Sequence, residues 1–191
     1  MGMNNLRNFI GRKETHVHAV CDVDSRNARA AKSVVDRTYG NNDCKMVGDF
    51  RELTRDPEID AVVICTPDHW HTPIALAALM AGKHVYVEKP LARTFQENDL
   101  LIQAERKYNV AAQMGNQGHA GEGARLLNEW IWDGAIGDIY EVHCWTNRPI
   151  WPQNVKKPTE IASLPPTMKW DLWIGPAPWR YYHPAYAPFA W

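Results

Sequence analysis

The chain has 191 residues, of which 45% are hydrophobic, and its formal net charge is −1. These values are typical of a globular chain with one domain, or with one domain and part of another. They exclude a basic surface for nucleic acid, and no apolar run is long enough to cross a membrane. No signal peptide is visible at Met1, so we expect a cytoplasmic protein, with export through an upstream leader as the alternative.

Strands and helices alternate along most of the chain. Apolar periodicity and capping residues predict helices over residues 2–10, 24–39, 50–55, 72–82, 94–108 and 124–134. Apolar runs, many of them rich in β-branched residues, predict strands over residues 17–23, 46–47, 60–65, 84–87 and 110–114. The alternating order indicates parallel strands joined by right-handed crossovers, and the continuous apolar runs indicate helices on both faces. We therefore predict an α/β fold with a doubly wound parallel sheet.

The pattern changes after Gly134. Residues 139–146 are predicted to form a longer strand, because Tyr140, Val142 and Cys144 alternate with polar residues. Six of the nine tryptophans lie at or after Trp145, together with many prolines and little periodicity. Such tryptophans could stack on sugar rings, but we favour a place in a core or a subunit interface. This shift in composition marks a second region, over residues 120–191.

Metal-binding patterns are weak in this sequence. The four cysteines form no CxxC pair, so neither a disulfide framework nor a zinc site is indicated. The segment Asp68–His71 has two histidines two residues apart, but no third ligand stands close to them in the sequence. Zinc requires at least three protein ligands. We therefore expect no metal, and His71 can be read as the start of a helix.

The stretch His84–Pro90 organises the predicted site. It begins as a strand and ends on Glu88, Lys89 and Pro90, and ligands of parallel α/β sheets bind beyond the carboxyl ends of strands. A lysine there can hydrogen-bond a hydroxyl or carbonyl, and the neighbouring carboxylate can hold the ammonium in place. Pro90 could make the preceding peptide bond cis. The alternative is a strand that ends in an ordinary polar turn.

Several short motifs, in this order and spacing, resemble the Gfo/Idh/MocA family of oxidoreductases. The matching segments are Val20–Asp24, Cys65–His71, Glu88–Pro90, Gln113–Gln117 and Trp170–Pro176. The resemblance covers nearly the whole chain. It implies a Rossmann-type nucleotide-binding domain over residues 1–119 and the beginning of an α/β substrate and oligomerisation domain over residues 120–191.

Family members begin with a strand and a glycine-rich turn, and they continue well beyond the length of this chain. Met1 to Met3 are similar to the tail of that turn, and the family's active-site histidine would follow Trp191. We therefore expect a fragment truncated at both ends, with an incomplete sheet and no turnover of its own. His183 is a substitute for the missing histidine, although it precedes the usual position.

The resemblance also implies a set of residues that bind NAD. They are Gly2, Asp22, Thr66, Pro67, His71, Glu88 and Gln113. An acid at the position of Asp22 accepts hydrogen bonds from the adenosine ribose and favours NAD over NADP, while Asp24 caps the next helix. Arg26 is the opposing signal, because an arginine near this point can receive a 2′-phosphate.

The resemblance makes Lys89 the main catalytic candidate and Glu88 the residue that positions it. Asn116 and Gln117 are candidates for contact with substrate hydroxyls, with surface polarity as the alternative. The implied activity is hydride transfer between NAD and a sugar, polyol or related cyclic alcohol, in a homo-oligomer with no nucleic-acid or membrane partner. The alternatives are an NAD-dependent glycosidase of the same family and a non-catalytic nucleotide-binding sensor.

Overall fold

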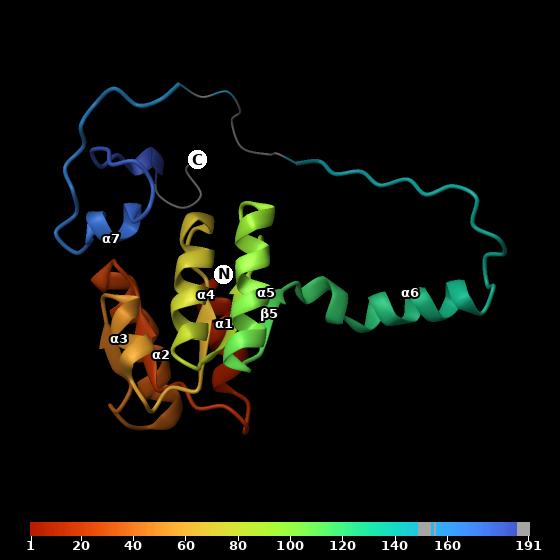
Figure 1. Cartoon of the computed structure of the whole chain (residues 1–191), viewed down its shortest axis with the longest axis horizontal. Coiled ribbons are helices and arrows are strands. Elements are labelled where there is room, and N and C mark those ends of the chain that lie inside the picture. Colours follow the sequence, from red (N-terminus) through yellow and green to blue (C-terminus); the bar gives the residue numbers. More distant parts are fainter. Residues whose placement is uncertain (149–153, 155, 187–191) are drawn as a thin grey trace.

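The computed structural model describes residues 1–148, 154 and 156–186 (Figure 1). Its strands are Ala19–Cys21 (β1), Lys45–Val47 (β2), Ala61–Ile64 (β3), His84–Glu88 (β4) and Ala112–Gly115 (β5). Its helices are Gly2–Ile10 (α1), Ser25–Tyr39 (α2), Phe50–Arg55 (α3), His71–Met80 (α4), Phe95–Tyr108 (α5), Glu122–Trp132 (α6) and Trp170–Ile174 (α7). Short 3₁₀ turns cover Asp68–Trp70 (η1), Gln117–Ala120 (η2) and Pro184–Tyr186 (η3).

The strands are parallel and form two sheets. One sheet has the order β1-β2, and the other has the order β3-β4-β5. In the larger sheet Ile64 lies opposite Val87, and Val87 lies opposite Met114, so the carboxyl ends of the three strands are aligned. Strands β1 and β3 do not pair in the described part of the chain. The predicted α/β fold with parallel strands is confirmed, and its sheet is divided between β1 and β3.

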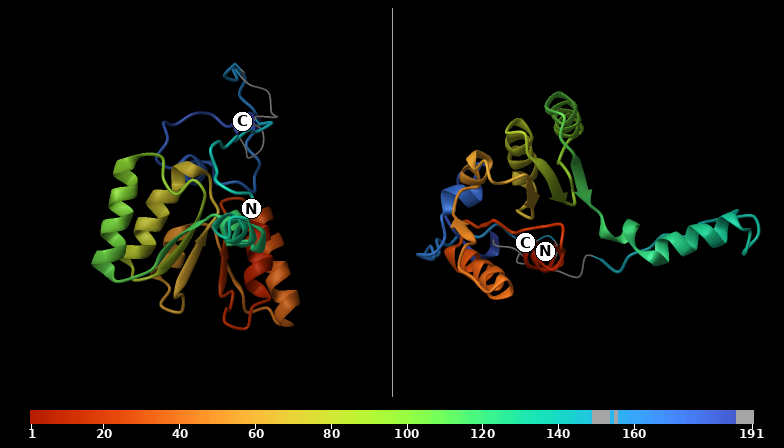
Figure 2. Two further views of the ribbon diagram at one scale, coloured as in Figure 1. Left: turned by 90° about the vertical axis from the view of Figure 1, so that its right-hand side faces the viewer. Right: turned by 90° about the horizontal axis from the view of Figure 1, so that it is seen from below.

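Helices lie on both faces of the strands. In the right-hand view of Figure 2, α4 and α5 lie on one side of the strands and α1 and α2 on the other. The main core lies between α4, α5 and the larger sheet, where Leu79 and Val87 are both 0% exposed. Burying side chains of this size stabilises the fold by about 1.5–3 kcal/mol each. A smaller core around Val20 and Val35 joins α1 and α2 to β1.

Capping residues explain where the helices begin and end. Asp24 is the N-cap of α2 and accepts a hydrogen bond from the backbone N–H of Arg26 at 2.9 Å. Gly40 follows α2 with a φ of +69°, a left-handed conformation that glycine adopts without steric cost. Thr94 caps α5 in the same way by accepting from the N–H of Glu97. These caps are confirmed at the positions that the sequence predicts.

The segment that contains α7 docks on the N-terminal half of the chain. The backbone N–H of Ser25 donates to the carbonyl of Thr167 at 2.9 Å, and the N–H of Lys169 donates to the carbonyl of Val23 at 2.9 Å. Trp170 of α7 is 5% exposed and stacks on Trp173 at 4.7 Å between ring centroids. Trp170 therefore occupies a core, as we favoured for the tryptophans of this region. Trp145 and Trp179 do not, because they are 87% and 60% exposed, and Trp151 lies outside the described residues.

The strand predicted over residues 139–146 is not present. Residues 138–148 have neither helix nor strand, and Tyr140 is 95% exposed. Alternation of apolar and polar residues would place the apolar side chains on one face of a strand. A strand also needs a neighbouring strand that hydrogen-bonds to its backbone N–H and C=O groups. This segment and α6, which buries no residue, extend away from the remaining helices (Figure 1).

Within the described residues, no helix is both long enough and apolar enough to cross a membrane.

Candidate functional site

The carboxyl ends of β3, β4 and β5 lie side by side and carry most of the predicted site. Thr66 follows β3 by two residues, Glu88 ends β4, and Asn116 follows β5. Glu88 is paired in register with Gly115, so the ends of β4 and β5 are level. Ligands of parallel α/β sheets bind beyond this edge. The fold therefore brings together residues that lie up to fifty positions apart in the sequence.

Glu88 is the most constrained side chain at this edge. It is only 4% exposed, and its Oε1 atom accepts hydrogen bonds from Asn5 Nδ2 at 2.7 Å and from Gln117 Nε2 at 2.8 Å. Its Oε2 atom is buried without a hydrogen-bond partner in the described part of the chain. A buried oxygen of this kind is rare in folded proteins and calls for an explanation.

Lys89 is exposed at the end of the same strand, and the peptide bond to Pro90 is cis. The expected contact between the Lys89 ammonium and Glu88 is not formed among the described residues, where the carboxylate accepts instead from Asn5 and Gln117. Lys89 lies just beyond the last residue of β4. It therefore presents an exposed cation at the edge, while Glu88 is held inside.

His71 joins the turns that follow β3 and β4. Its ring is 1% exposed, with Nδ1 2.6 Å from the carbonyl oxygen of Pro90 and Nε2 2.8 Å from that of Thr66. The role expected from sequence was a contact with the cofactor, but this burial leaves His71 to act through the backbone of Thr66 and Pro90. Thr66 also carries a buried Oγ1 atom without a hydrogen-bond partner in the described residues. Pro67 follows Thr66 and precedes η1.

Two acids at the end of β1 have opposite electrostatic surroundings. Burial raises the pKa of Asp22, whose Oδ1 accepts from the backbone N–H of Asp24 at 2.8 Å. The side chain of Arg26 donates to Asp24 and lowers the pKa of that carboxyl to about 2, with Nη2 2.6 Å from Oδ2. Asp24 therefore caps α2 and holds Arg26, while Asp22 remains a half-buried acceptor at the sheet edge.

The remaining predicted residues differ in how well their positions match the expected site. Gly2 begins α1 and is exposed, and a Cβ atom there would meet Cys65 Cβ at an ordinary 3.6 Å. Gln113 was expected at the end of its strand but is the second residue of β5, and its Nε2 donates to the Met114 carbonyl at 2.8 Å. Asn116 is exposed, whereas the Gln117 amide is engaged by Glu88.

Asn5 is a site residue that the sequence did not reveal to us. It is 4% exposed on α1, and its Nδ2 lies 3.3 Å from Cys65 Sγ as well as 2.7 Å from Glu88. Burial raises the pKa of the Cys65 thiol, and the hydrogen bond from Asn5 opposes that rise. The available signal was a polar residue next to the apolar face of a predicted amphipathic helix, because buried polar groups need partners.

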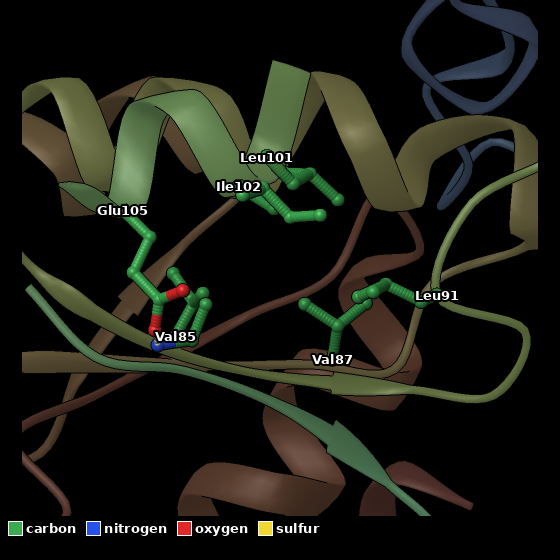
Figure 3. A pocket seen from close by; sticks show the side chains of 8 residues that line it. Val85, Val87, Leu91, Leu101, Ile102 and Glu105 are labelled. Atoms are coloured by element: carbon green, nitrogen blue, oxygen red, sulfur yellow. Dashed lines mark hydrogen bonds between the residues drawn. The ribbon is translucent and has the colours of Figure 1, made fainter. Parts of the chain in front are cut away.

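Two other features do not contribute to this site. His69 Nε2 lies 2.9 Å from the Trp173 carbonyl while His71 points elsewhere, and no group of three possible metal ligands occurs among the described residues. A cavity of about 170 Å³ lies between α5 and the larger sheet, lined mainly by apolar side chains such as Val85, Val87 and Leu101 (Figure 3). None of the predicted site residues lines that cavity.

Two features of the edge fit a bound dinucleotide. Asp22 offers a carboxylate acceptor at the end of β1, where a Rossmann fold holds the adenosine ribose. Thr66 Oγ1 and Glu88 Oε2, near the ends of β3 and β4, are buried polar atoms without hydrogen-bond partners among the described residues. Polar groups in ligand sites converge on one region, and these lie at the end of the strands where the nicotinamide half would be.

Comparisons with known proteins agree with this fold. The model of the Gfo/Idh/MocA oxidoreductase family, which has an NAD-binding Rossmann fold, matches residues 1–116. Levoglucosan dehydrogenase of Pseudarthrobacter phenanthrenivorans is 40% identical over 91 residues, which are 48% of this chain and 23% of that protein. Glycosyl hydrolase family 109 protein 1 of Shewanella sp. strain MR-4 is 31% identical over 146 residues, covering 72% of this chain and 31% of that protein.

Solved structures show the same relationship. The NAD-binding oxidoreductase of Klebsiella pneumoniae is 34% identical with a TM-score of 0.56, covering 71% of this chain and 35% of that chain. The scyllo-inositol dehydrogenase of Lactobacillus casei, solved with NAD(H) and scyllo-inositol, shares the fold with a TM-score of 0.63 and 24% identity. That match covers 72% of this chain and 39% of the dehydrogenase. The chain thus spans well under half the length of the relatives that it matches.

Proposed function

We propose that the whole protein transfers hydride between NAD and a sugar, polyol or related cyclic alcohol. The chain belongs to the Gfo/Idh/MocA oxidoreductase family, which has an NAD-binding Rossmann fold, and the proposal proceeds from that membership. The observation that carries this proposal is the sheet edge, where Lys89 is exposed and buried oxygens of Thr66 and Glu88 have no hydrogen-bond partner in the part of the chain that the structure describes. The similarity to levoglucosan dehydrogenase supports the substrate class.

Each residue of the edge has a distinct part in this proposal. NAD, when bound, supplies the hydride acceptor. Asp22 accepts hydrogen bonds from the adenosine ribose, and Gly2 lies at the N-terminus of α1, where a helix favours phosphate. Lys89 donates a hydrogen bond to the reacting oxygen and so orients the C–H bond. The same edge also carries Pro67, Gln113 and Asn116. Of the two amides, that of Asn116 is the one proposed to contact substrate hydroxyls.

NAD is the preferred cofactor over NADP in this proposal. The carboxylate of Asp22 repels a 2′-phosphate, and the guanidinium of Arg26 is occupied by Asp24, with Nε 3.2 Å from each carboxylate oxygen. An arginine held in this way is less available to receive a phosphate. The 2′-phosphate would therefore meet an acid and no free guanidinium at this position.

The glycosidase alternative is favoured by one specific observation. A glycosyl hydrolase family 109 protein covers more of this chain than levoglucosan dehydrogenase does, 72% against 48%. Such an enzyme would use NAD without net redox change, so it would release an aglycone and accumulate no NADH. A sensor, the remaining alternative, would bind the nucleotide and do neither.

The test is turnover by the complete gene product with NAD and a panel of free sugars, polyols and aryl glycosides. We expect NADH to accumulate with a free sugar or polyol, and the Lys89→Ala variant to lose about 10²-fold or more in kcat. Lys157→Ala, at an exposed lysine of the C-terminal region, is the matched control. Aglycone release without NADH would instead establish the glycosidase.

A homo-oligomeric state and a cytoplasmic location belong to the same proposal. Gel filtration tests the oligomeric state, and cell fractionation tests the location.

A further inference from the structure

We propose that Asn5 is a positioning residue of this site: its amide fixes the Glu88 carboxylate and, through the end of β4, the starting point of the Lys89 side chain. This inference rests on the proposed function. Asn5 itself touches neither cofactor nor substrate in this proposal. It acts from α1, a helix that is far from β4 in the sequence.

The first step in the argument is the burial of Asn5 itself. Its side chain is 4% exposed, whereas Asn4 and Asn8 of the same helix are exposed. A buried amide is unfavourable unless its polar atoms find partners. Asn5 Nδ2 finds two, Glu88 Oε1 at 2.7 Å and Cys65 Sγ at 3.3 Å, which lie at the ends of β4 and β3. This amide therefore joins α1 to two neighbouring strands at the ligand edge.

The second step is the asymmetry of the Glu88 carboxylate. The amides of Asn5 and Gln117 approach from different elements, α1 and η2, and both donate to Oε1. A carboxylate can accept about four hydrogen bonds, yet Oε2 is buried without any among the described residues. Two donors on Oε1 fix the rotation of the Glu88 carboxylate. Oε1 thus holds the side chain in place, while Oε2 can still accept hydrogen bonds.

The third step connects Glu88 to Lys89. Glu88 is the last residue of β4 and is held in register with Gly115, so its anchored side chain fixes the strand end. Lys89 follows Glu88 directly in the chain, so anchoring Glu88 also fixes the backbone position from which the Lys89 side chain starts. A catalytic group must be held within about 0.5 Å of its productive position. Loss of the Asn5 amide should therefore affect catalysis more than cofactor affinity.

A double-mutant cycle in the complete gene product tests this inference. The variants are Asn5→Leu, which is similar in size but has no donor, Glu88→Ala, and the two combined. We expect Asn5→Leu to lower kcat about tenfold while the NAD dissociation constant changes less than about twofold. In the Glu88→Ala background, Asn5→Leu should change kcat by less than about twofold, because its partner is already absent. Asn8→Leu, at an exposed position of the same helix, is the control and should retain kcat.

The outcomes separate this inference from the proposed function. Equal losses from Asn5→Leu in both backgrounds, or no loss at all, would overturn the role of Asn5 in an enzyme that is otherwise active. A parent protein without turnover on any sugar, polyol or glycoside would overturn the proposed function and this role with it. If Asn5→Leu does not fold, Asn5→Ser replaces it, because its shorter side chain does not extend to Glu88, and the same kcat loss is expected.

Discussion

Residues 1–120 and the described part of residues 121–186 differ sharply in how much they bury, although α6 in the second region has a clear apolar face. In the first region Leu79 of α4 is 0% exposed, while in the second Leu127 of α6 is 56% exposed and Trp132 is 80% exposed. The first region has strands on which its helices pack, whereas α6 contacts mainly the preceding turn η2 among the described elements. Amphipathic pattern alone therefore does not produce burial, because an apolar face is buried only where a second surface meets it.

The largest expected effect comes from the two leucines of this comparison. Leu79→Ala should lower the free energy of unfolding by about 2–5 kcal/mol, because it removes a fully buried side chain from a close-packed core. Leu127→Ala, the matched control in α6, should change it by no more than about 0.5 kcal/mol. Urea unfolding followed by circular dichroism measures both values. Equal losses would mean that α6 is packed in solution and that the contrast is wrong.

A slightly smaller effect is expected where the second region does meet the first. Trp170→Ala should loosen the docked segment around α7, because Trp170 is 5% exposed and holds this segment together by donating its indole N–H to the Arg180 carbonyl at 2.8 Å. The loss should be about 3 kcal/mol of docking free energy, seen as faster tryptic cleavage at Arg180. Trp132→Ala, at an exposed tryptophan, should leave the cleavage rate unchanged. Unaltered proteolysis of Trp170→Ala would refute the docking.

An intermediate effect is expected at His71, which lies wholly within the first region. His71→Leu should cost about 1–3 kcal/mol of unfolding free energy, because the carbonyls of Thr66 and Pro90 lose their contacts with the ring nitrogens. His119→Leu, at an exposed histidine, provides the control. Thermal unfolding of both variants gives the comparison, and identical melting temperatures would assign His71 no role in joining the two turns.

The smallest effect concerns pH and the acids at the end of β1. The pKa of Asp24 is lowered to about 2 in the folded protein. Asp24 therefore adds to the free energy of unfolding at pH values above the ordinary carboxyl pKa, and this stabilisation is lost as the pH falls toward 2. The pKa of Asp22 is raised by folding, so any stabilisation from Asp22 is lost as the pH rises through its folded-state pKa. At neutral pH, Asp24→Asn should therefore lower the unfolding free energy, whereas Asp22→Asn should leave it unchanged or raise it. Unfolding curves across the acid range measure both, and a loss of stability in Asp22→Asn at neutral pH would contradict the assignment.

Local patterns predicted much of the first region and of its site. Helices α2 and α5 begin at their expected caps, and Glu88 and Lys89 stand at the end of a strand as the segment His84–Pro90 indicated. Residue roles inferred from family resemblance remain predictions. The expected contact between Glu88 and Lys89 is not formed among the described residues, because Asn5 and Gln117, which lie far from Glu88 in the sequence, occupy its carboxylate.

The sequence by itself determined most helices and strands of the first region, the limits of α2 at Asp24 and Gly40, and the place of Glu88 at the carboxyl edge. These features depend on backbone geometry and on side chains a few residues apart. Only the tertiary structure decided that Asn5 and Gln117 hold Glu88, that His71 joins two turns, and that residues 139–146 lack a partner. Each of these features depends on segments that are far apart in the sequence. How sheets and helices pack decides which of those segments meet, and no pattern of neighbouring residues specifies it.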